Sequence, residues 1–308
     1  MNVFSAPSDL NAADRRVCVA IGVFDGVHLG HQQVLRQTLE DARQCEGIPV
    51  AVTFDQHPSA VVAPDREPPM IYSVKKKMAT VASYGLKNIW LIHFDKSFSR
   101  IPGREFVTTL AKDFGRLQSL CVGSEFSFGY RRTGNVALLK DMGAQLGFKV
   151  HGLSAVSLDG ESVSSTRIRA AVQQGDLDAA SQMLGRAYTL SGSVQKGDQI
   201  GRQLGVPTAN LDVSGLVLPP SGVYAVHVSV DGHEHRAVLN IGVRPTLNRP
   251  EPTVRVETHL LDFDGDLYGH ELELTFVDKI RVERKFSGLD ELKEQISADI
   301  EFARRIFG

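Results

Sequence analysis

The chain has 308 residues, of which 42% are apolar and 23% are charged. This balance excludes disordered and fibrous proteins and leaves enough apolar side chains for sizeable cores. The 34 basic and 36 acidic side chains nearly cancel, which excludes the global basic field of a nucleic-acid-binding protein. Because single cores stop growing near ~250 residues, we expect two domains.

The cysteines and the N-terminus indicate the compartment. Cys18, Cys45 and Cys121 are odd in number and widely spaced, which fits neither a disulfide framework nor a zinc site. Asp9 and Asp14 interrupt the N-terminal segment where a signal peptide would be apolar, and no later stretch approaches the ~18 apolar residues of a membrane span. We therefore expect a soluble cytoplasmic protein without membrane or nucleic-acid partners.

Residues 17 to about 155 alternate between short apolar runs and amphipathic stretches. The apolar runs are at 17–23, 48–54, 88–94, 117–123 and 148–156, and the amphipathic stretches are at 34–45, 75–84, 105–114 and 137–146. Apolar strands separated by helices predict a doubly wound α/β fold with a parallel sheet. Its ligand is expected beyond the carboxyl ends of the strands.

A helix, a break at Gly175 and a second short helix are predicted between residues 164 and 184, closing a first domain at 1–184. The pattern then changes to alternating strands at 188–195, 222–230, 235–242, 253–261 and 270–281. Closely spaced strands without intervening helices predict a small closed β-barrel. A terminal helix from Leu289 to Ile306 completes the second domain, 185–308.

The segment GVFDGVHLGH, residues 22–31, follows the first apolar strand and precedes a helix. His28 and His31 therefore lie at a helix N-terminus, where Gly26 and Gly30 let the backbone approach a ligand and where N–H groups favour phosphate. Two imidazoles there can stabilise the charge of a five-coordinate α-phosphorus. The segment matches the HxGH motif of the nucleotidyltransferase superfamily.

A second phosphate site is predicted at SSTRIR, residues 164–169. Hydroxyls and cations at a helix start suit the β- and γ-phosphates that depart. The alternative is an ordinary helix cap with exposed arginines.

Four segments, GVFDGVHLGHQ, TFDQHP, VGSEFSFGYRRTG and VSSTRIR, together resemble the N-terminal half of bacterial bifunctional riboflavin kinase/FAD synthetases. The resemblance implies that ATP is handled by His28, His31, Ser165, Thr166 and Arg169, with Phe24, Asp25 and Gly26 in the nucleotide loop. The chain departs from the family at Gln56, commonly proline, and at Glu125, commonly Asp or Asn. A chain that has kept only the kinase activity is therefore an alternative.

The barrel region contains no GxxxxGK[ST] motif, which excludes a P-loop kinase. It offers Gly201 and Gly205 in a flexible turn, followed by Thr208 and Asn210, whose oxygens can ligate Mg²⁺ beside ATP phosphates. Glu257, on another strand, can accept the proton of an attacking hydroxyl. The alternative for PTAN is a polar turn between strands.

The ordered segments GRxLGxPTANL, GVYAV, NIGxRPT, VETHLLDF, DLYG and RxExKF resemble the riboflavin kinase domain. The resemblance implies that Thr208 and Asn210 hold Mg²⁺ and nucleotide phosphate and that Glu257 is the catalytic base. It also implies contacts to ATP or flavin from Gly201, Gly205, Pro207, Arg281 and Glu283.

Three other signals favour structural roles. DFDGDLYGHELE resembles a calcium loop but has Leu267 where the turn needs glycine, so a strand-to-strand turn is predicted. The run Lys75–Lys77 is predicted to be a solvated helix face. His57, His93 and His151 stand in apolar surroundings and are predicted to be structural.

We therefore predict a flavin-making enzyme that converts riboflavin to FMN and FMN to FAD, using ATP and Mg²⁺. Its partners are small molecules, and it is a monomer or weak oligomer. A flavin-binding storage protein without catalysis is the non-enzymatic alternative.

Overall fold

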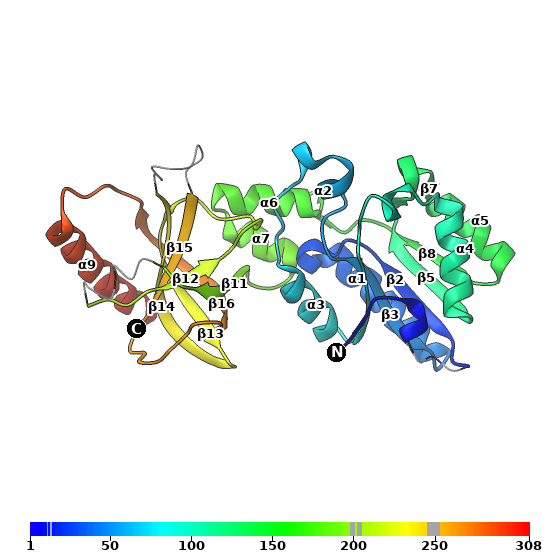
Figure 1. Ribbon diagram of the computed structural model, residues 1–308, viewed down its shortest axis with the longest axis horizontal. Coiled ribbons are helices and arrows are strands. Elements are labelled where there is room, and N and C mark those ends of the chain that lie inside the picture. Colours follow the sequence, from blue (N-terminus) through cyan, green and yellow to red (C-terminus); the bar gives the residue numbers. More distant parts are fainter. Residues whose placement is uncertain (11, 13, 198–200, 202–204, 245–252) are drawn as a thin grey trace. The chain divides into compact units, whose positions relative to one another are not determined.

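The computed structural model describes residues 1–10, 12, 14–197, 201, 205–244 and 253–308 (Figure 1). They form two compact units. The first comprises Met1–Arg167 with Met183–Gly185, and the second comprises Ile168–Gln182 with Arg186–Gly308. The expected domain boundary between residues 184 and 185 stays a prediction, since the segment Ile168–Gln182 groups with the second unit.

Six parallel strands form the sheet of the first unit, in the order β1-β4-β3-β2-β5-β8. They are β1 (Asn2–Phe4), β2 (Val17–Ile21), β3 (Ile48–Phe54), β4 (Asn88–Ile92), β5 (Leu117–Gly123) and β8 (Lys149–Leu153). The chain runs outward from β2 in both directions, first through β3 and β4 and then through β5 and β8. The loop after β2 therefore lies at a topological switch point, where doubly wound sheets bind ligands.

Helices cover both faces of this sheet. In β2 all five residues are buried, and alternate side chains point to opposite faces. Val17, Val19 and Ile21 share a core with α4 (Gly103–Phe114) and α5 (Val136–Leu146). Ala20 shares another with α1 (Leu29–Gln44) and α3 (Val74–Ser83). The predicted doubly wound fold is confirmed.

Shorter pieces connect these elements. They are α2 (Ser59–Val62), the 3-10 turns η1 (Pro7–Asp9), η2 (Asp25–Val27), η3 (Pro64–Arg66), η4 (Phe98–Arg100) and η5 (Tyr130–Arg132), and the two-residue strands β6 (Ser127–Phe128), β7 (Gly134–Asn135), β9 (Ser157–Leu158) and β10 (Glu161–Ser162).

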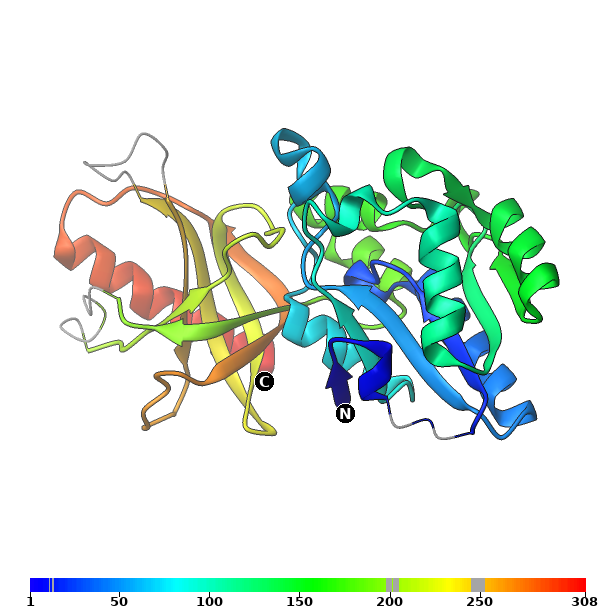
Figure 2. The same ribbon diagram turned by 45° about the vertical axis from the view of Figure 1, so that its right-hand side comes forward.

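The second unit is a closed antiparallel barrel in the order β11-β12-β15-β14-β13-β16 (Figure 2). Its strands are β11 (Thr189–Gln195), β12 (Ala209–Asp212), β13 (Gly222–Val230), β14 (His233–Arg244), β15 (Thr253–Leu260) and β16 (Glu271–Val282). Inward side chains such as Leu190, Leu239 and Leu272 fill it without exposed surface. The helix α9 (Leu289–Phe307) packs on β13, β14 and β16. The predicted barrel and terminal helix are confirmed.

Two helices, α6 (Ser165–Gln174) and α7 (Leu177–Leu184), precede the barrel. They are separated at Gly175, whose φ of 81° places it in the left-handed region that ends helices. Among the described residues no helix is both long and apolar enough to cross a bilayer.

Candidate functional sites

The loop after β2 brings both predicted histidines to a helix N-terminus. Phe24 (φ 53°) and Gly26 (φ 76°) have left-handed backbone, which reverses the chain between β2 and α1. A Cβ at Gly26 would lie 2.9 Å from the side chain of Ile71. A larger residue at this position would be strained both by its positive φ and by this contact. His28 is the N-cap residue of α1, and His31 follows in the first turn. The N–H groups at such a helix start are able to bind an anion such as phosphate.

The two imidazoles stack, with ring centroids 3.7 Å apart and an interplanar angle of 23°. The ring of Phe24 meets His31 edge-on, with centroids 5.3 Å apart. Nδ1 of His31 is shielded from solvent and has no hydrogen-bond partner among the described residues. Burial lowers the pKa of His31 well below its usual value, and the nearby His28 and Lys77 lower it further. His31 is thus an uncharged imidazole at neutral pH.

Asp25 fixes the loop before the histidines. Its side chain is buried, and Oδ1 accepts hydrogen bonds from the backbone N–H groups of Ile71 at 2.9 Å and Tyr72 at 3.3 Å. Its backbone oxygen accepts a hydrogen bond from the Ser165 hydroxyl at 2.9 Å. The structure therefore brings Ser165 and the nucleotide loop together although they are far apart in sequence.

The other residues of the second phosphate motif are placed differently. Thr166 is exposed, and Arg169 is buried on the part of α6 that belongs to the second unit. Arg167 donates to the backbone oxygens of Leu158 and Glu161 at 3.0 and 3.1 Å. The phosphate-binding roles of Ser165, Thr166 and Arg169 stay predictions.

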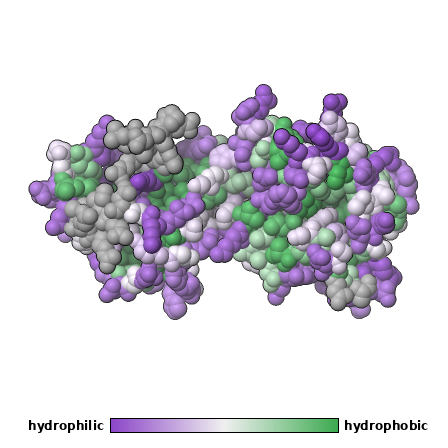
Figure 3. Space-filling view, in the orientation of Figure 1, coloured by the Kyte–Doolittle hydropathy of each residue, from purple (hydrophilic) through white to green (hydrophobic). Residues whose placement is uncertain are grey.

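An aromatic cavity of about 710 Å³ opens beside the same loop. Its lining includes Val23, just before Phe24, and a set of aromatic residues from strand ends, the turn η4 and the helix α4: Phe54, Phe94, Phe98, Phe106, Phe126 and Phe128. The rings of Phe126 and Phe128 stack with centroids 5.3 Å apart. Figure 3 shows apolar side chains exposed on the face of this unit that it draws. The sequence analysis missed the cavity, although phenylalanines directly after predicted strands were a usable signal.

The two departures from the family both belong to this region. Gln56 donates from Nε2 to the backbone oxygen of Phe94 at 2.7 Å, so it braces the end of β4. Glu125 is exposed and immediately precedes Phe126. His57 lines the cavity, and its Nδ1 accepts from the N–H of Ser59 at 3.1 Å. Gln56 and Glu125 both lie outside the histidine loop, so neither departure changes a residue of that loop.

Two expectations about charged residues were wrong. His93 is 75% exposed and pairs with Asp55 at 2.5 Å, so its surroundings are polar. Lys77 has no exposed surface, whereas the run Lys75–Lys77 was predicted to be a solvated face. α3 turns Lys77 inward because it is three residues from Thr80 and four from Val81, both of which are also buried.

In the barrel, Asn210 and Glu257 are cross-strand neighbours on β12 and β15. Both are half-buried, while the residues that alternate with them, Ala209 and Val256, are buried in the core. The pleat therefore places Thr208, Asn210 and Glu257 on one outer face. The structure brings together three residues that the sequence separates by up to 49 positions. Arg255 lies 3.9 Å from the Glu257 carboxylate.

Glycines make room for these side chains. A Cβ at Gly201 would lie 2.4 Å from the backbone oxygen of Val206 and 3.1 Å from Oγ1 of Thr208. A Cβ at Gly197 would lie 2.3 Å from the amide of Asn210. Hydroxyl, amide and carboxylate oxygens are the donor types that Mg²⁺ prefers, so the side chains of Thr208, Asn210 and Glu257 on this face fit a magnesium ion. No cluster of three or more His, Cys, Asp or Glu among the described residues forms a metal site.

A second cavity, of about 610 Å³, adjoins Thr208. Pro207, Thr208 and Ala209 form one wall, and the turn between β15 and β16, residues 263–268, forms another. This is the segment that resembles a calcium loop, and the predicted strand-to-strand turn is confirmed. Gly205, with φ 80°, is exposed and has open space around its Cα.

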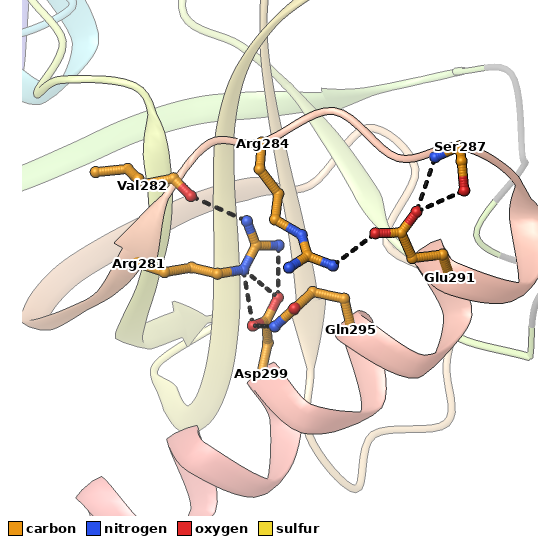
Figure 4. Close-up of polar contacts among 7 residues, drawn as sticks. All are labelled: Arg281, Val282, Arg284, Ser287, Glu291, Gln295 and Asp299. Atoms are coloured by element: carbon orange, nitrogen blue, oxygen red, sulfur yellow. Dashed lines mark hydrogen bonds and ion pairs between the residues drawn. The ribbon is translucent and has the colours of Figure 1, made fainter.

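Arg281 and Glu283, the predicted flavin neighbours, occupy different surroundings. The guanidinium of Arg281 donates to the Asp299 carboxylate of α9 at 2.8 and 2.9 Å (Figure 4). Gln295 donates to the same carboxylate at 2.8 Å. Arg281 therefore ties the end of β16 to α9, and its flavin contact stays a prediction.

Glu283 lies closer to the predicted base. Its Oε1 would be 2.7 Å from a Cβ on Gly242, and Asn240 Nδ2 would be 3.3 Å from that same Cβ. Asn240 is the β14 neighbour of Glu257 in the barrel register. The sequence analysis assigned no role to Asn240. Its position at the start of the NIGxRPT segment, residues 240–246, was the available signal, and residues 245 and 246 of that segment lie outside the described residues.

Comparisons with known proteins match two different families to the two parts of the chain. A family model described as FAD synthetase matches residues 10–167. A model described as riboflavin kinase matches residues 184–307. Each match therefore covers one of the two candidate sites.

Some known proteins resemble the chain over almost its whole length. The chain is 38% identical over 295 residues to a bifunctional riboflavin kinase/FMN adenylyltransferase of Pseudomonas fluorescens, covering 95% of this chain and 94% of that protein. It is 36% identical to the protein of the same name from Escherichia coli K12, covering 100% and 98%. A crystal structure described as a macrolide-efflux protein from Streptococcus pneumoniae aligns over 98% of both chains, with TM-score 0.81 and 28% identity.

Proposed function

We propose that each of the two units of this chain, which belongs to the family of bifunctional riboflavin kinases/FMN adenylyltransferases, catalyses one of two reactions. The first unit adenylylates FMN to FAD at the histidine loop, and the second phosphorylates riboflavin at the barrel. The family and enzyme class predicted from the sequence are confirmed. The residue roles below are our proposal.

In the first unit, the phosphate of FMN attacks the α-phosphorus of ATP, and pyrophosphate leaves. Negative charge develops on the α-phosphate oxygens as phosphorus becomes five-coordinate. Backbone N–H groups at the start of α1, with His28 and His31, supply hydrogen bonds to that charge. Two stacked imidazolium ions would repel each other, so an uncharged His31 beside His28 favours this arrangement.

The flavin ring occupies the aromatic cavity. Its volume of about 710 Å³ lies within the range of small-molecule sites, and the stacked pair Phe126 and Phe128 offers the planar surface that an aromatic ring prefers. The observation that carries the proposal is this cavity opening at Val23, directly before the loop that holds the stacked histidines.

In the second unit, the Glu257 carboxylate accepts the proton of the riboflavin primary hydroxyl as it attacks the γ-phosphorus of ATP. Thr208 and Asn210 hold Mg²⁺, which neutralises phosphate charge when bound. The cavity between Pro207 and the 263–268 turn holds the nucleotide. Gly201 and Gly205 let the preceding backbone approach the phosphates, and Glu283 and Arg281 border the flavin.

The setting follows from the same features. Cys18, Cys45 and Cys121 form no disulfide in the structure, which is consistent with the cytoplasm that we propose. We expect a monomer or weak oligomer that acts on small-molecule substrates.

The test is product analysis with the purified chain, riboflavin, ATP and Mg²⁺. We expect FMN with ADP, followed by FAD with pyrophosphate, and neither product without Mg²⁺. FMN without FAD, even when FMN is supplied, would establish the kinase-only alternative. Bound riboflavin without ADP would establish a storage protein.

A further inference from the structure

Lys77 is a buried lysine that neither proposed reaction uses. It has no exposed surface, whereas Lys75 on the same helix is exposed. Its Nζ donates a hydrogen bond to the backbone oxygen of Phe54 at 2.7 Å. A cation removed from water is costly unless its surroundings compensate, so its burial calls for a specific reason.

Three titratable groups face Lys77 from three different elements. Asp25 lies before α1 and Asp55 follows β3, and the charges of both favour the ammonium form. His31, on α1, is held neutral in part by the positive charge of Lys77. Burial is the larger effect and lowers the pKa of Lys77 to about 8. Lys77 is therefore charged at neutral pH but loses its proton within the accessible range.

The position of these groups connects the two halves of the adenylylation site. Phe54 ends β3, and its ring lines the aromatic cavity. Asp25 opens the loop that delivers His28 and His31, and its carboxylate is buried. Lys77 thus lies between the segment that would hold the flavin and the segment that would hold the nucleotide.

We propose that Lys77 is a positioning residue for adenylyl transfer. Its ammonium holds the end of β3 and the Asp25 loop in place, so that FMN bound in the aromatic cavity and the two histidines are placed at the same phosphorus atom. This inference rests on the adenylylation proposed above. A buried amine is a poor choice for stability alone, since an apolar side chain of similar length would fill the space without the cost of desolvation.

The test substitutes Lys77→Met, which keeps the length and removes the charge and the donor, with Lys75→Met as the matched exposed control. FAD formation from FMN, riboflavin phosphorylation and the melting temperature are measured for both. We expect Lys77→Met to lower kcat for FAD formation about 10- to 100-fold, since small misplacements have such effects. Riboflavin phosphorylation and thermal stability are expected to match those of Lys75→Met.

The pH dependence of FAD formation is a second measurement, and it would not change if Lys77 had a merely structural role. In the unmodified chain, FAD formation is expected to fall as the pH rises through about 8, where Lys77 loses its charge, while riboflavin phosphorylation does not follow. Lys77→Met is expected to lack that alkaline decline.

FAD formation by Lys77→Met within about twofold of the control would overturn the inference. If Lys77→Met unfolds the first unit, the unmodified chain decides: an alkaline decline confined to FAD formation supports the role, and a flat profile overturns it. No FAD from FMN in the unmodified chain would overturn the proposed function instead, and the inference with it.

Discussion

The two units place their reactive groups by different physical means. In the first, the histidines depend on a sharp loop. The carboxylate of Asp25 in this loop is buried and accepts hydrogen bonds from the N–H groups of Ile71 and Tyr72, and the Ser165 hydroxyl donates to the Asp25 backbone oxygen. In the second, Asn210 and Glu257 meet because they are register partners on adjacent strands. A loop held by buried polar contacts can be disturbed from several remote segments. A site built by strand register is set by the barrel itself.

Substitution of Glu257 should give the largest difference between the activities of the two units. Glu257→Gln removes the proposed base and keeps the shape, so riboflavin phosphorylation should fall by about 10² to 10⁴, the usual range for general-base removal. FAD formation from supplied FMN should not change. Glu234→Gln, an exposed carboxyl on β14, is the control. Equal loss of both activities would mean that the sites are not independent.

The opposite effect, loss of FAD formation with riboflavin phosphorylation retained, is expected from His31→Ala. Loss of one hydrogen-bonding group at the developing charge should lower FAD formation by about 10² to 10³ and leave riboflavin phosphorylation intact. His93→Ala, also in the first unit and 75% exposed, controls for loss of an imidazole. Unchanged FAD formation in His31→Ala would remove the histidine loop from the mechanism.

Gly201→Ala tests the close packing beside the proposed magnesium site. The new Cβ would lie 2.4 Å from the backbone oxygen of Val206, so the turn and Thr208 must shift, and kcat/KM for riboflavin phosphorylation should fall about 10- to 30-fold. Gly288→Ala, where the Cβ meets nothing within 4 Å, is the control. Equal kinetics of the two variants would show that the turn tolerates the change.

The smallest effect is expected from Phe126→Ala in the aromatic cavity. Loss of one stacking partner should raise KM for FMN about fivefold, since aromatic pairs contribute ~1 kcal/mol. KM for riboflavin in the kinase reaction should stay the same. Phe302→Ala, an exposed aromatic on α9, is the control. If the KM for riboflavin rises instead, the aromatic cavity is not the FMN site of the adenylylation reaction.

The sequence predicted most of the fold because its signals are local. The run IPVAVTF is β3 itself, residues 48–54, and GVYAVHVSV is β13, residues 222–230. The short strands β1 and β12 were missed, since three or four residues carry too little periodicity. The histidines and Glu257 could be proposed as site residues because their motifs are contiguous, and their roles stay predictions.

What the sequence could not give depends on tertiary placement. A run of three lysines favours solvent, and only the packing of α3 against η2 puts Lys77 inside. The aromatic cavity draws on strand ends that are far apart in the chain. Arg281 was predicted near the flavin, but its ion pair with Asp299 depends on where α9 packs.

The most direct test mixes two impaired proteins. Glu257→Gln and His31→Ala, each impaired in one step, are combined with riboflavin, ATP and Mg²⁺, and FAD is measured over a time in which neither variant alone forms it from riboflavin. Independent sites predict that FAD appears, because His31→Ala releases FMN that Glu257→Gln adenylylates. No FAD from the mixture, although each protein performs its remaining reaction alone, would contradict two self-sufficient sites.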